Sequence, residues 1–405
     1  MTKADKEGQR KTPVLRFKGF TDDWEQRKLG DVVKFFDNFR KPLKSSDRKK
    51  GIYPYYGATG IIDYINDYIF DGEYVLLSED GANIIDRNYP VSFITEGKFW
   101  VNNHAHIMRS DNNSNYFISL LLEKINYIKY NSGSAQPKLT SKNVKKIILF
   151  IPSKLEQKQL SDFILKLSNL ITLYERKLKL LSQVKKYFLD NLFAEKEYPN
   201  LRFKGFTDAW EKIKLKDTQT TLTDGNYANL YPKPADMTDA DKGIPFLTGG
   251  NLKNGILDLE NAKYITKEKH SQLKSGHLEE DDIVIAVRGS LGELGYVTKQ
   301  NIDWNINSQL AIIRTSKNEL IGKFLLYFFL SSKGKSKLLS RQTGTALKQL
   351  PLQQLKTIVV PKTLLLEQQK ISNILKTIDK TISFYKGKQQ HFAEIKNTLL
   401  NTMFI

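Results

Sequence analysis

This chain contains one segment twice. Residues 15–25 read LRFKGFTDDWE and residues 201–211 read LRFKGFTDAWE, so ten of eleven positions agree at an offset of 186. A second set of matches, at an offset of 211, closes each half: Gly133-Ser134-Ala135 with Gly344-Thr345-Ala346, Leu139 with Leu350, Glu156-Gln157 with Glu367-Gln368, Tyr174 with Tyr385, Lys177 with Lys388, and Phe193 with Phe404. A period of about 200 residues is the size of a domain. We therefore expect two tandem domains with similar tasks.

The charge balance indicates a polyanionic partner. Lys and Arg number 63 against 44 Asp and Glu, which leaves a formal charge of +19 over 405 residues. Nucleic acid is the usual partner of such a surface, although a merely soluble basic protein or a ribosome-associated protein has the same composition. No run of eighteen apolar residues and no signal-like start occur, so we expect a cytoplasmic protein without membrane contact. The absence of cysteine excludes disulfides and thiolate metal sites.

The residue pattern changes from strand-like to helix-like at matching places in the two halves. Short β-like runs separated by Gly, Asn and Asp turns fill both halves, and a long stretch rich in Leu, Lys and Gln follows each of them. We predict an α+β fold with two mixed α/β recognition domains, each followed by a long helix. The expected segments are a flexible tail over 1–13, a first domain over 14–152, a helix over 153–197, a second domain over 198–361 and a helix over 362–405.

The two helical stretches carry an apolar stripe at matching positions. In the first, apolar residues lie mostly three, four or seven apart, from Leu160 to Leu192, and adding 211 to each number gives another apolar residue. A helix of about 40 residues is roughly 60 Å long. We expect the two helices to pair as an antiparallel coiled coil with pseudo-twofold symmetry, holding the domains apart. The alternative is two separate amphipathic helices, each lying on its own domain.

Catalytic and metal-binding patterns are missing from the sequence. No phosphate-binding loop and no amine-holding Asn/Asp-Pro-Pro-Tyr/Phe motif occur, and the glycines from Gly289 to Gly295 indicate a turn. His104 and His106 would share one face of an extended segment, but no third ligand is indicated. The other histidines, His270, His277 and His391, are interpreted as scattered. The acidic run 279–282 is interpreted as solvated loop charge. We expect neither an enzyme nor a metal site.

Binding chemistry is present instead. Basic residues interleave with tyrosines between Arg40 and Tyr56, which suits phosphate contacts. Base reading requires Asn, Gln, Arg, Ser or acidic side chains on loops near the groove. The candidate DNA-binding residues are Arg40, Lys41, Lys44, Tyr55, Tyr56, Glu79, Asp80, Asn83, Asn102, Asn103 and His104 in the first domain, and Asp224, Asn226, Thr248, Asn251, Lys253, Arg288, Ser290, Asn307 and Gln309 in the second. Each of these could equally be an ordinary exposed turn residue.

Several motifs together carry a family resemblance. They are the duplicated LRFKGFTD-x-WE segment, YPYYGATG over 53–60, SEDGAN over 78–83, Gly249-Gly250-Asn251, Arg288-Gly289-Ser290, and the two helix starts in which a proline precedes Glu-Gln. In this order, over nearly the whole chain, they resemble the specificity subunit of a type I restriction-modification system.

The resemblance implies two target recognition domains that each read half of a bipartite, asymmetric site in double-stranded DNA, with the helices setting the spacer. It implies two modification subunits, which methylate adenine with S-adenosylmethionine, and two restriction subunits, which use ATP and Mg²⁺. It also implies that this chain carries no cofactor of its own. The helix faces over 153–193 and 363–404 would then dock the partners, through Tyr174, Lys177, Phe193, Tyr385, Lys388 and Phe404.

Two other classes of function remain open from the residues alone. One is a self-contained nuclease or methyltransferase, which would be active as the purified chain with cofactor. The other is a coiled-coil scaffold or an RNA-binding protein without DNA sequence specificity, which competition between duplex DNA and RNA would reveal.

Overall fold

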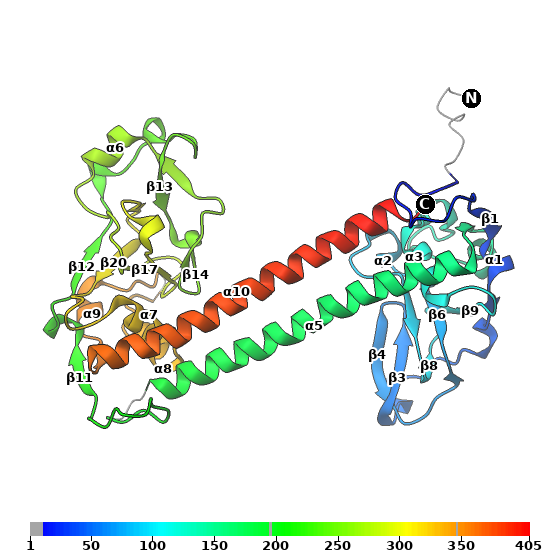
Figure 1. The fold of residues 1–405 in the computed structure, drawn as a ribbon, viewed down its shortest axis with the longest axis horizontal. Coiled ribbons are helices and arrows are strands. Elements are labelled where there is room, and N and C mark those ends of the chain that lie inside the picture. The colour runs from blue at the N-terminus through cyan, green and yellow to red at the C-terminus, as the bar shows by residue number, and fades with distance from the viewer. Residues whose placement is uncertain (1–10, 194–196, 346) are drawn as a thin grey trace. The chain divides into compact units, whose positions relative to one another are not determined.

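The computed structural model describes residues 11–193, 197–345 and 347–405, so most of the expected tail over 1–13 lies outside the described residues. The chain divides into two compact units (Figure 1). Unit 1 contains residues 1–175 and 387–405, and unit 2 contains residues 176–386. Each unit therefore holds one β-rich domain together with a part of both long helices.

Unit 1 is built on two four-stranded sheets. One has the order β2 (Lys34–Phe35), β9 (Ala105–Arg109), β6 (Tyr74–Ser78), β7 (Ser92–Thr95), with every neighbour antiparallel. The other has the order β4 (Gly60–Ile65), β3 (Lys50–Gly57), β8 (Lys98–Val101), β5 (Phe70–Asp71), in which β3 and β8 are parallel. The helix α3 (Asn115–Lys124) packs on β6 and β7 through its buried face.

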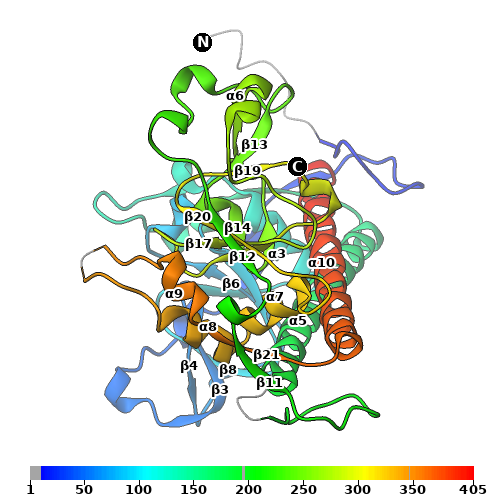
Figure 2. The same cartoon turned by 90° about the vertical axis from the view of Figure 1, so that its left-hand side faces the viewer.

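Unit 2 repeats this plan. Its four-stranded sheet has the order β12 (Thr221–Asp224), β20 (Leu310–Arg314), β17 (Ile283–Ala286), β18 (Leu294–Tyr296), again antiparallel throughout (Figure 2). Its second sheet has the order β16 (Lys263–Ile265), β13 (Ile244–Leu247), β19 (Asn305–Ile306), in which β13 and β19 are parallel. The apolar helix α7 (Gly322–Leu330) takes the place of α3. The sequence repeat is thus a repeat of topology, including the rarer parallel pair.

Smaller elements fill the connections. The short helices are α1 (Leu29–Val32), α2 (Asn83–Asp86), α4 (Ser141–Val144), α6 (Lys267–Gln272), α8 (Ser332–Leu339) and α9 (Leu352–Lys356), and β14 (Leu252–Lys253) pairs with β15 (Ile256–Leu257). A two-stranded sheet begins and ends each domain: β1 (Glu25–Lys28) with β10 (Ile148–Ile151), and β11 (Glu211–Lys214) with β21 (Val359–Lys362). The chain therefore leaves each domain beside the strand through which it entered.

The two long helices follow these closing strands. They are α5 (Lys154–Leu192) and α10 (Leu365–Thr402), close to the stretches predicted from the apolar stripe. Most stripe residues are buried or half-buried, whereas Val184 is 42% exposed. In unit 1 the ring of Tyr174 on α5 stacks on Phe392 on α10, with 5.8 Å between centroids. In unit 2 the Lys177 ammonium donates to the Tyr385 hydroxyl at 2.6 Å. The facing stripes therefore meet within each unit.

The repeated LRFKGF segment lies at a helix end in both units. In unit 1 the Leu15 amide donates to the Thr402 carbonyl at 2.9 Å, and in unit 2 the Leu201 amide donates to the Asn191 carbonyl at 3.0 Å. Each segment thus satisfies a carbonyl at the end of a long helix, where the last four have no partner inside the helix. The duplicated motif is therefore explained by the closure of each unit.

Aromatic packing completes the two main cores. In unit 1 Trp24 and Phe404 both contact Phe117 on α3, and in unit 2 Trp210 and Phe193 both contact Phe324 on α7. These matching positions explain why the sequence repeats there. Among the described residues, no helix is both long enough and apolar enough to span a membrane.

Candidate nucleic-acid interface

An asparagine begins the same turn in both domains. The backbone N–H of Asn102 donates to the Tyr56 carbonyl at 3.0 Å, and the backbone N–H of Asn307 donates to the Leu247 carbonyl at 2.9 Å. The Asn102 side-chain oxygen then accepts from the His104 amide at 2.8 Å, and that of Asn307 accepts from the Gln309 amide at 3.0 Å. Both asparagines are more than 90% buried. Their side chains hold the turn and present the residue two positions later.

Two further segments join this turn by backbone hydrogen bonds. In the first domain the His104 carbonyl accepts from the Glu79 amide, and the backbone of Asp80 forms a β-bridge with Lys138. In the second the Gln309 carbonyl accepts from the Val287 amide, and Arg288 forms a β-bridge with Gln349. We call residues 79–81, 102–104 and 137–139 loop cluster 1, and residues 287–290, 307–309 and 348–350 loop cluster 2. The two clusters have one backbone design.

Different side chains occupy the equivalent positions of the two clusters. In loop cluster 1, His104 Nδ1 lies 2.8 Å from an Asp80 carboxylate oxygen, and Lys138 is exposed beside them. In loop cluster 2 the three positions are Arg288, Gln309 and Gln349, all of them exposed. One cluster therefore offers a carboxylate, an imidazole and an ammonium group, and the other offers a guanidinium and two amides. These are hydrogen-bonding groups that can read base edges.

Tyr227 accompanies loop cluster 2. The Arg288 guanidinium lies 5.6 Å from the centre of its ring, and the ring hydroxyl donates to Asp224 at 2.9 Å. Burial and this bond to the carboxylate raise the pKa of Tyr227, so the phenol stays protonated. The arginine is thereby held over an aromatic face, and its Nε donates to the Gln349 side-chain oxygen at 3.4 Å.

Some predicted site residues are used inside the first domain. Arg40 donates to Glu79 at 2.6 Å and to the Ala105 carbonyl at 2.7 Å, and the Arg40 and Glu79 side chains are each only 13% exposed. Tyr55 is fully buried, and its hydroxyl accepts from the Leu43 amide. Tyr56 is also buried in the sheet. Internal pairing accounts for Arg40, Glu79 and Tyr55, and Tyr56 packs its ring against Phe93 and Phe99.

Of the other predicted site residues in the first domain, one holds a loop and three are exposed. Asn83 makes two hydrogen bonds to the backbone of Tyr89, so its amide holds a loop. Lys41, Lys44 and Asn103 are exposed. The Lys41 carbonyl accepts from the Trp100 indole at 2.6 Å, which fixes the backbone while leaving the ammonium in solvent. The side chains of both lysines are thus open to solvent.

In the second domain, four predicted residues support the fold. The buried Asn226 bonds to the Ser275 carbonyl and the Lys274 amide. The buried Asn251 accepts from the Thr248 amide and hydroxyl, in a capped turn. The remaining one, Lys253, pairs with Asp258 at 2.7 Å and with Glu260 at 2.8 Å. Those carboxylates raise the pKa of Lys253 and occupy its charge. Ser290, by contrast, is exposed in the turn after β17.

The helix residues predicted to bind partners have roles within the units. Phe193 is fully buried and Phe404 is 6% exposed, so each packs in the core of its unit instead of facing a partner. Tyr174 and Tyr385 lie between the facing helices, where the Lys177 ammonium is 4.0 Å from the centre of the Tyr385 ring. Lys388 is exposed. The burial of the two phenylalanines removes them from any docking surface.

Three residues of the candidate interface are not among those predicted from the sequence: Lys138, Gln349 and Tyr227. A signal was available for the first two, because each directly precedes a leucine of the matched pair Leu139 and Leu350. Tyr227 follows the candidates Asp224 and Asn226 in the sequence, but its place beside Arg288 depends on the fold.

Two interpretations of charged residues were wrong. The acidic run is not all solvated: Asp282 is 1% exposed and forms two hydrogen bonds to Arg314, each of 2.8 Å. Burial raises the pKa of Asp282, and the guanidinium opposes that rise. His270 and His277 are not scattered either, since their ring centroids lie 4.7 Å apart.

His104 and His106, by contrast, separate. His106 is 1% exposed and bonds to Asp37 at 2.7 Å and to the Leu139 carbonyl at 2.8 Å. Although burial opposes it, the bond from His106 contributes to lowering the pKa of Asp37. The imidazole therefore joins loop cluster 1 to β9 and its neighbouring turn.

The family profile described as type I restriction modification DNA specificity domain matches the chain twice, over residues 21–183 and 208–393. The chain belongs to this family. It is a type I restriction-modification specificity subunit with two tandem DNA recognition domains, as the motifs predicted.

Individual relatives agree in name and in fold. A candidate type I restriction enzyme specificity subunit of Haemophilus influenzae is 28% identical over 321 residues, covering 76% of this chain and 77% of that protein. A type I restriction enzyme specificity subunit of Methanocaldococcus jannaschii is 23% identical over 407 residues, covering 94% and 92%. The crystal structure of the S subunit of a type I restriction-modification system from M. genitalium superposes with a TM-score of 0.67 at 15% identity, covering 97% and 99%. The specificity-subunit fold therefore extends over nearly the whole chain.

Proposed function

We propose that loop cluster 1 and loop cluster 2 each read one half of a bipartite site in double-stranded DNA. The observation that carries this proposal is the pairing of one backbone design with two sets of side chains. Two domains that both bind DNA can use the same backbone arrangement of loops, whereas two different half-sites require different hydrogen-bonding side chains.

The side chains suggest how each cluster reads bases. Arg288 suits the two acceptors of a guanine in the major groove, and Gln309 or Gln349 suits an adenine. In loop cluster 1 the Asp80 carboxylate can accept from a cytosine amine, while Lys138 can donate to guanine. One good bidentate pair discriminates against the wrong base by about 1–3 kcal/mol.

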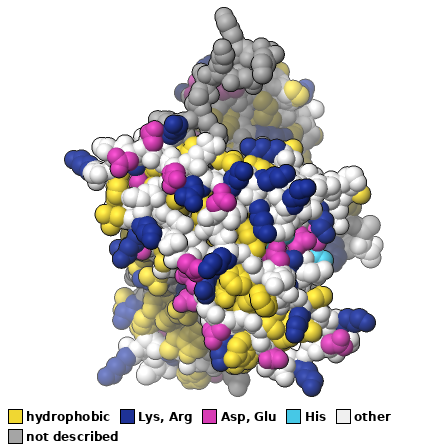
Figure 3. Space-filling model, turned by 90° about the vertical axis from the view of Figure 1, so that its right-hand side faces the viewer, with side chains coloured by type: hydrophobic (Ala, Val, Ile, Leu, Met, Phe, Trp, Pro, Cys, Tyr) yellow, Lys and Arg dark blue, Asp and Glu magenta, His cyan; other side chains and the backbone are white. Residues whose placement is uncertain are grey.

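Phosphate contacts supply the remaining affinity in this proposal. On the face drawn in Figure 3, Lys and Arg side chains are spread among hydrophobic, Asp and Glu side chains and do not gather in one patch. Lys41 and Lys44 are exposed in the first domain. Dispersed cations give salt-dependent affinity without sequence information, so specificity falls to the loop clusters.

The long helices are proposed to pair as an antiparallel coiled coil and to fix the separation of the half-sites. Support comes from the contacts of Tyr174 with Phe392 and of Lys177 with Tyr385. Further support comes from the equivalent closure of both units, which a pseudo-twofold arrangement requires. Half-sites one turn of DNA apart are separated by about 34 Å, a distance that helices of 39 and 38 residues can span.

Catalysis is assigned in this proposal to partners. Modification subunits would dock on the exposed helix faces and methylate adenine with S-adenosylmethionine, and restriction subunits would use ATP and Mg²⁺. A target adenine must leave the base stack to react. The specificity subunit would then hold the flanking bases while a partner supplies the pocket.

Mapping of N6-methyladenine in cells that express this chain with its neighbouring modification subunit tests the proposal. A bipartite motif is expected that depends on the chain. Arg288→Gln together with Gln309→Ala should change the second half of the motif only, and Asp80→Asn together with His104→Ala the first half only. Arg27→Gln, an exposed arginine on β1, is the matched control and should leave both halves unchanged. A change in both halves with either variant would contradict independent reading.

A further inference from the structure

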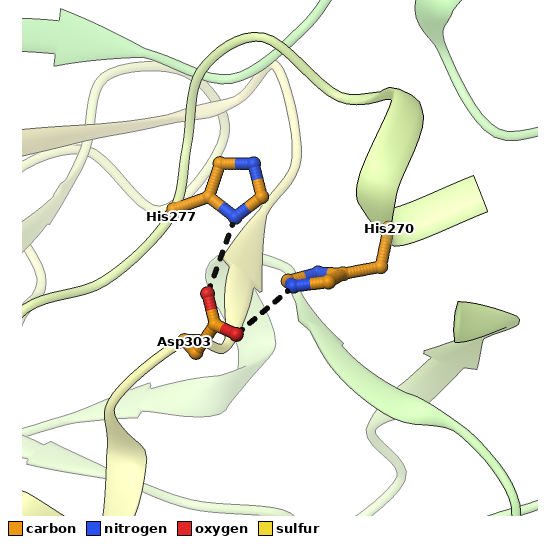
Figure 4. Close-up of side chains that lie close together, drawn as sticks. All are labelled: His270, His277 and Asp303. Carbon is orange, nitrogen blue, oxygen red and sulfur yellow. Dashed lines mark ion pairs between the residues drawn. The ribbon is translucent and has the colours of Figure 1, made fainter. Parts of the chain in front are cut away.

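Three potential metal ligands converge in the second domain. His270 lies on α6, His277 lies in the loop after α6, and Asp303 lies just before β19 (Figure 4). Asp303 Oδ2 is 3.2 Å from His270 Nε2, and Asp303 Oδ1 is 3.4 Å from His277 Nδ1. One atom from each residue lies within 4.8 Å of the other two. The two rings thus approach the carboxylate from different segments of the chain.

The outer hydrogen bonds fix which nitrogen of each ring carries hydrogen. His277 Nε2 is 3.0 Å from the Leu273 carbonyl, which can only accept, so Nε2 donates. His270 Nδ1 likewise donates to the Asn305 side-chain oxygen. In a neutral imidazole the other nitrogen bears a lone pair. The nitrogens that face the Asp303 carboxylate, His270 Nε2 and His277 Nδ1, are therefore the ones that can bind a cation.

The spacing fits a cation. Charge-assisted N–H···O bonds are about 2.7–2.9 Å long, whereas these contacts are 3.2 and 3.4 Å. Ligand bonds of about 2.0–2.2 Å at tetrahedral angles separate neighbouring ligand atoms by about 3.3 Å. The two histidine–carboxylate separations are close to this length, and they join the rings to different oxygens of Asp303.

We propose that His270, His277 and Asp303 bind one divalent transition-metal ion of the Zn²⁺ class, with water in the fourth position. Two imidazoles and one carboxylate form a ligand set that such ions accept. Bonds from ligand histidines to a carbonyl and to an amide oxygen are the usual supporting partners, because they orient the rings. The Asp303 side chain is 67% exposed, which leaves a path for the ion to enter.

The ion would stabilise the frame of the second domain. The backbone of His277 forms a β-bridge with Asn305 in β19. In the loop that contains His277, the Lys274 amide and the Ser275 carbonyl form hydrogen bonds to the Asn226 side chain. The strand β19 leads directly into the turn at Asn307. A metal here ties α6 and its loop to the strand that carries part of loop cluster 2. The site is structural, and no reaction step passes through it.

Metal binding by the untagged full chain tests the proposal. The protein is treated with a chelator, dialysed and titrated with Zn²⁺, and bound metal is measured by elemental analysis. About one ion per chain is expected, with an increase in thermal stability. Co²⁺ in the same site should give the strong visible absorption of a four-coordinate centre.

Two ligand variants and two control variants decide the result. Asp303→Asn and His277→Gln should each weaken Zn²⁺ binding by at least about tenfold, since each removes one of three protein ligands. Asn suits position 303 because the backbone there has φ of 66°. His104→Gln and His391→Gln remove histidines outside the cluster and should bind as the wild type does.

Failure of the wild type to bind stoichiometric Zn²⁺, or unchanged binding in both ligand variants, would overturn the proposal. Binding that is lost only in His104→Gln would also overturn it. Since no DNA enters the experiment, its failure would leave the proposed function of the loop clusters untouched.

Discussion

Arg16 forms a two-bonded ion pair with Glu156, with N–O distances of 2.6 and 2.7 Å, and the carboxylate is 1% exposed. The pair joins the duplicated LRFKGF segment to the first turn of α5. Arg202 and Glu367 repeat it in unit 2 at 2.8 and 2.9 Å. Each recognition domain is thereby fastened to the start of its own helix.

The two ion pairs should differ in how much they stabilise. Arg16→Met leaves a buried carboxylate unpaired, which costs about 3–5 kcal/mol. In unit 2, Glu367 also accepts from Trp210 and Thr363, so Arg202→Met should cost about 1–2 kcal/mol less. Urea unfolding of both variants measures the difference. Equal losses would contradict the prediction, and Glu156→Gln should recover part of the loss when combined with Arg16→Met.

Lys323 should make the stability of unit 2 rise with pH. Burial lowers the pKa of Lys323 to about 8 from 10.5. Between these values the unfolded chain binds more protons at this site than the folded chain, so the free energy of unfolding increases with pH over that window. The contribution is up to about 3 kcal/mol. This gain in stability is absent below pH 8, because Lys323 is then charged in the folded state and its burial is unfavourable.

Urea unfolding at pH 7.5 and pH 9.5 tests this dependence. Lys323→Met should be more stable than the wild type at pH 7.5, and the difference should shrink at pH 9.5. The exposed Lys28→Met is the control and should show no such change. A constant difference between Lys323→Met and wild type at both pH values would refute the assignment.

Lys41 and Lys44 should contribute affinity without specificity. Replacing both by Gln should weaken binding to cognate and unrelated duplexes to a similar extent, and it should lower the slope of log affinity against log salt concentration by about 2. Fluorescence anisotropy over a range of salt concentrations measures both quantities. A loss confined to cognate DNA would instead make these lysines base-reading residues.

The helices should act as a ruler if their stripes pair as proposed. Deleting seven residues from the middle of both α5 and α10 keeps the stripe in register and shortens each by about 10.5 Å. The spacer of the methylated motif should then fall by about three base pairs, at 3.4 Å each. An unchanged spacer would show that the helices do not set it. Deleting three residues from each is the control that should disrupt pairing.

The sequence was informative about periodic and repeated features. The apolar stripe located both long helices, because a helix in contact along one face leaves its period in the chain. The offset of 211 marked residues that perform one packing task twice, such as Phe193 and Phe404. Recognition of the family followed from motifs in a fixed order, and the residues within those motifs needed no structure to be found.

The roles of single polar residues could not be predicted, because they depend on partners far away in the sequence. Asn251 and Asn307 are residues of a type that can read bases, yet their side-chain oxygens accept from backbone amides of their own turns. Asp282 is buried because the register of β17 with β20 places Arg314 beside it. Asp303 meets His277 and His270, which lie 26 and 33 residues earlier in the chain.

Unit 1 is built from two separate stretches, residues 1–175 and 387–405, which affects the order in which the two units can fold during translation. Its core includes Met403 and Phe404, which are translated more than 200 residues after Trp24 and Phe117. At about 5–20 residues per second, the first domain waits roughly ten to forty seconds for them. Unit 2 is a continuous stretch and has all its residues earlier. The domain that is synthesised first is therefore the one completed last.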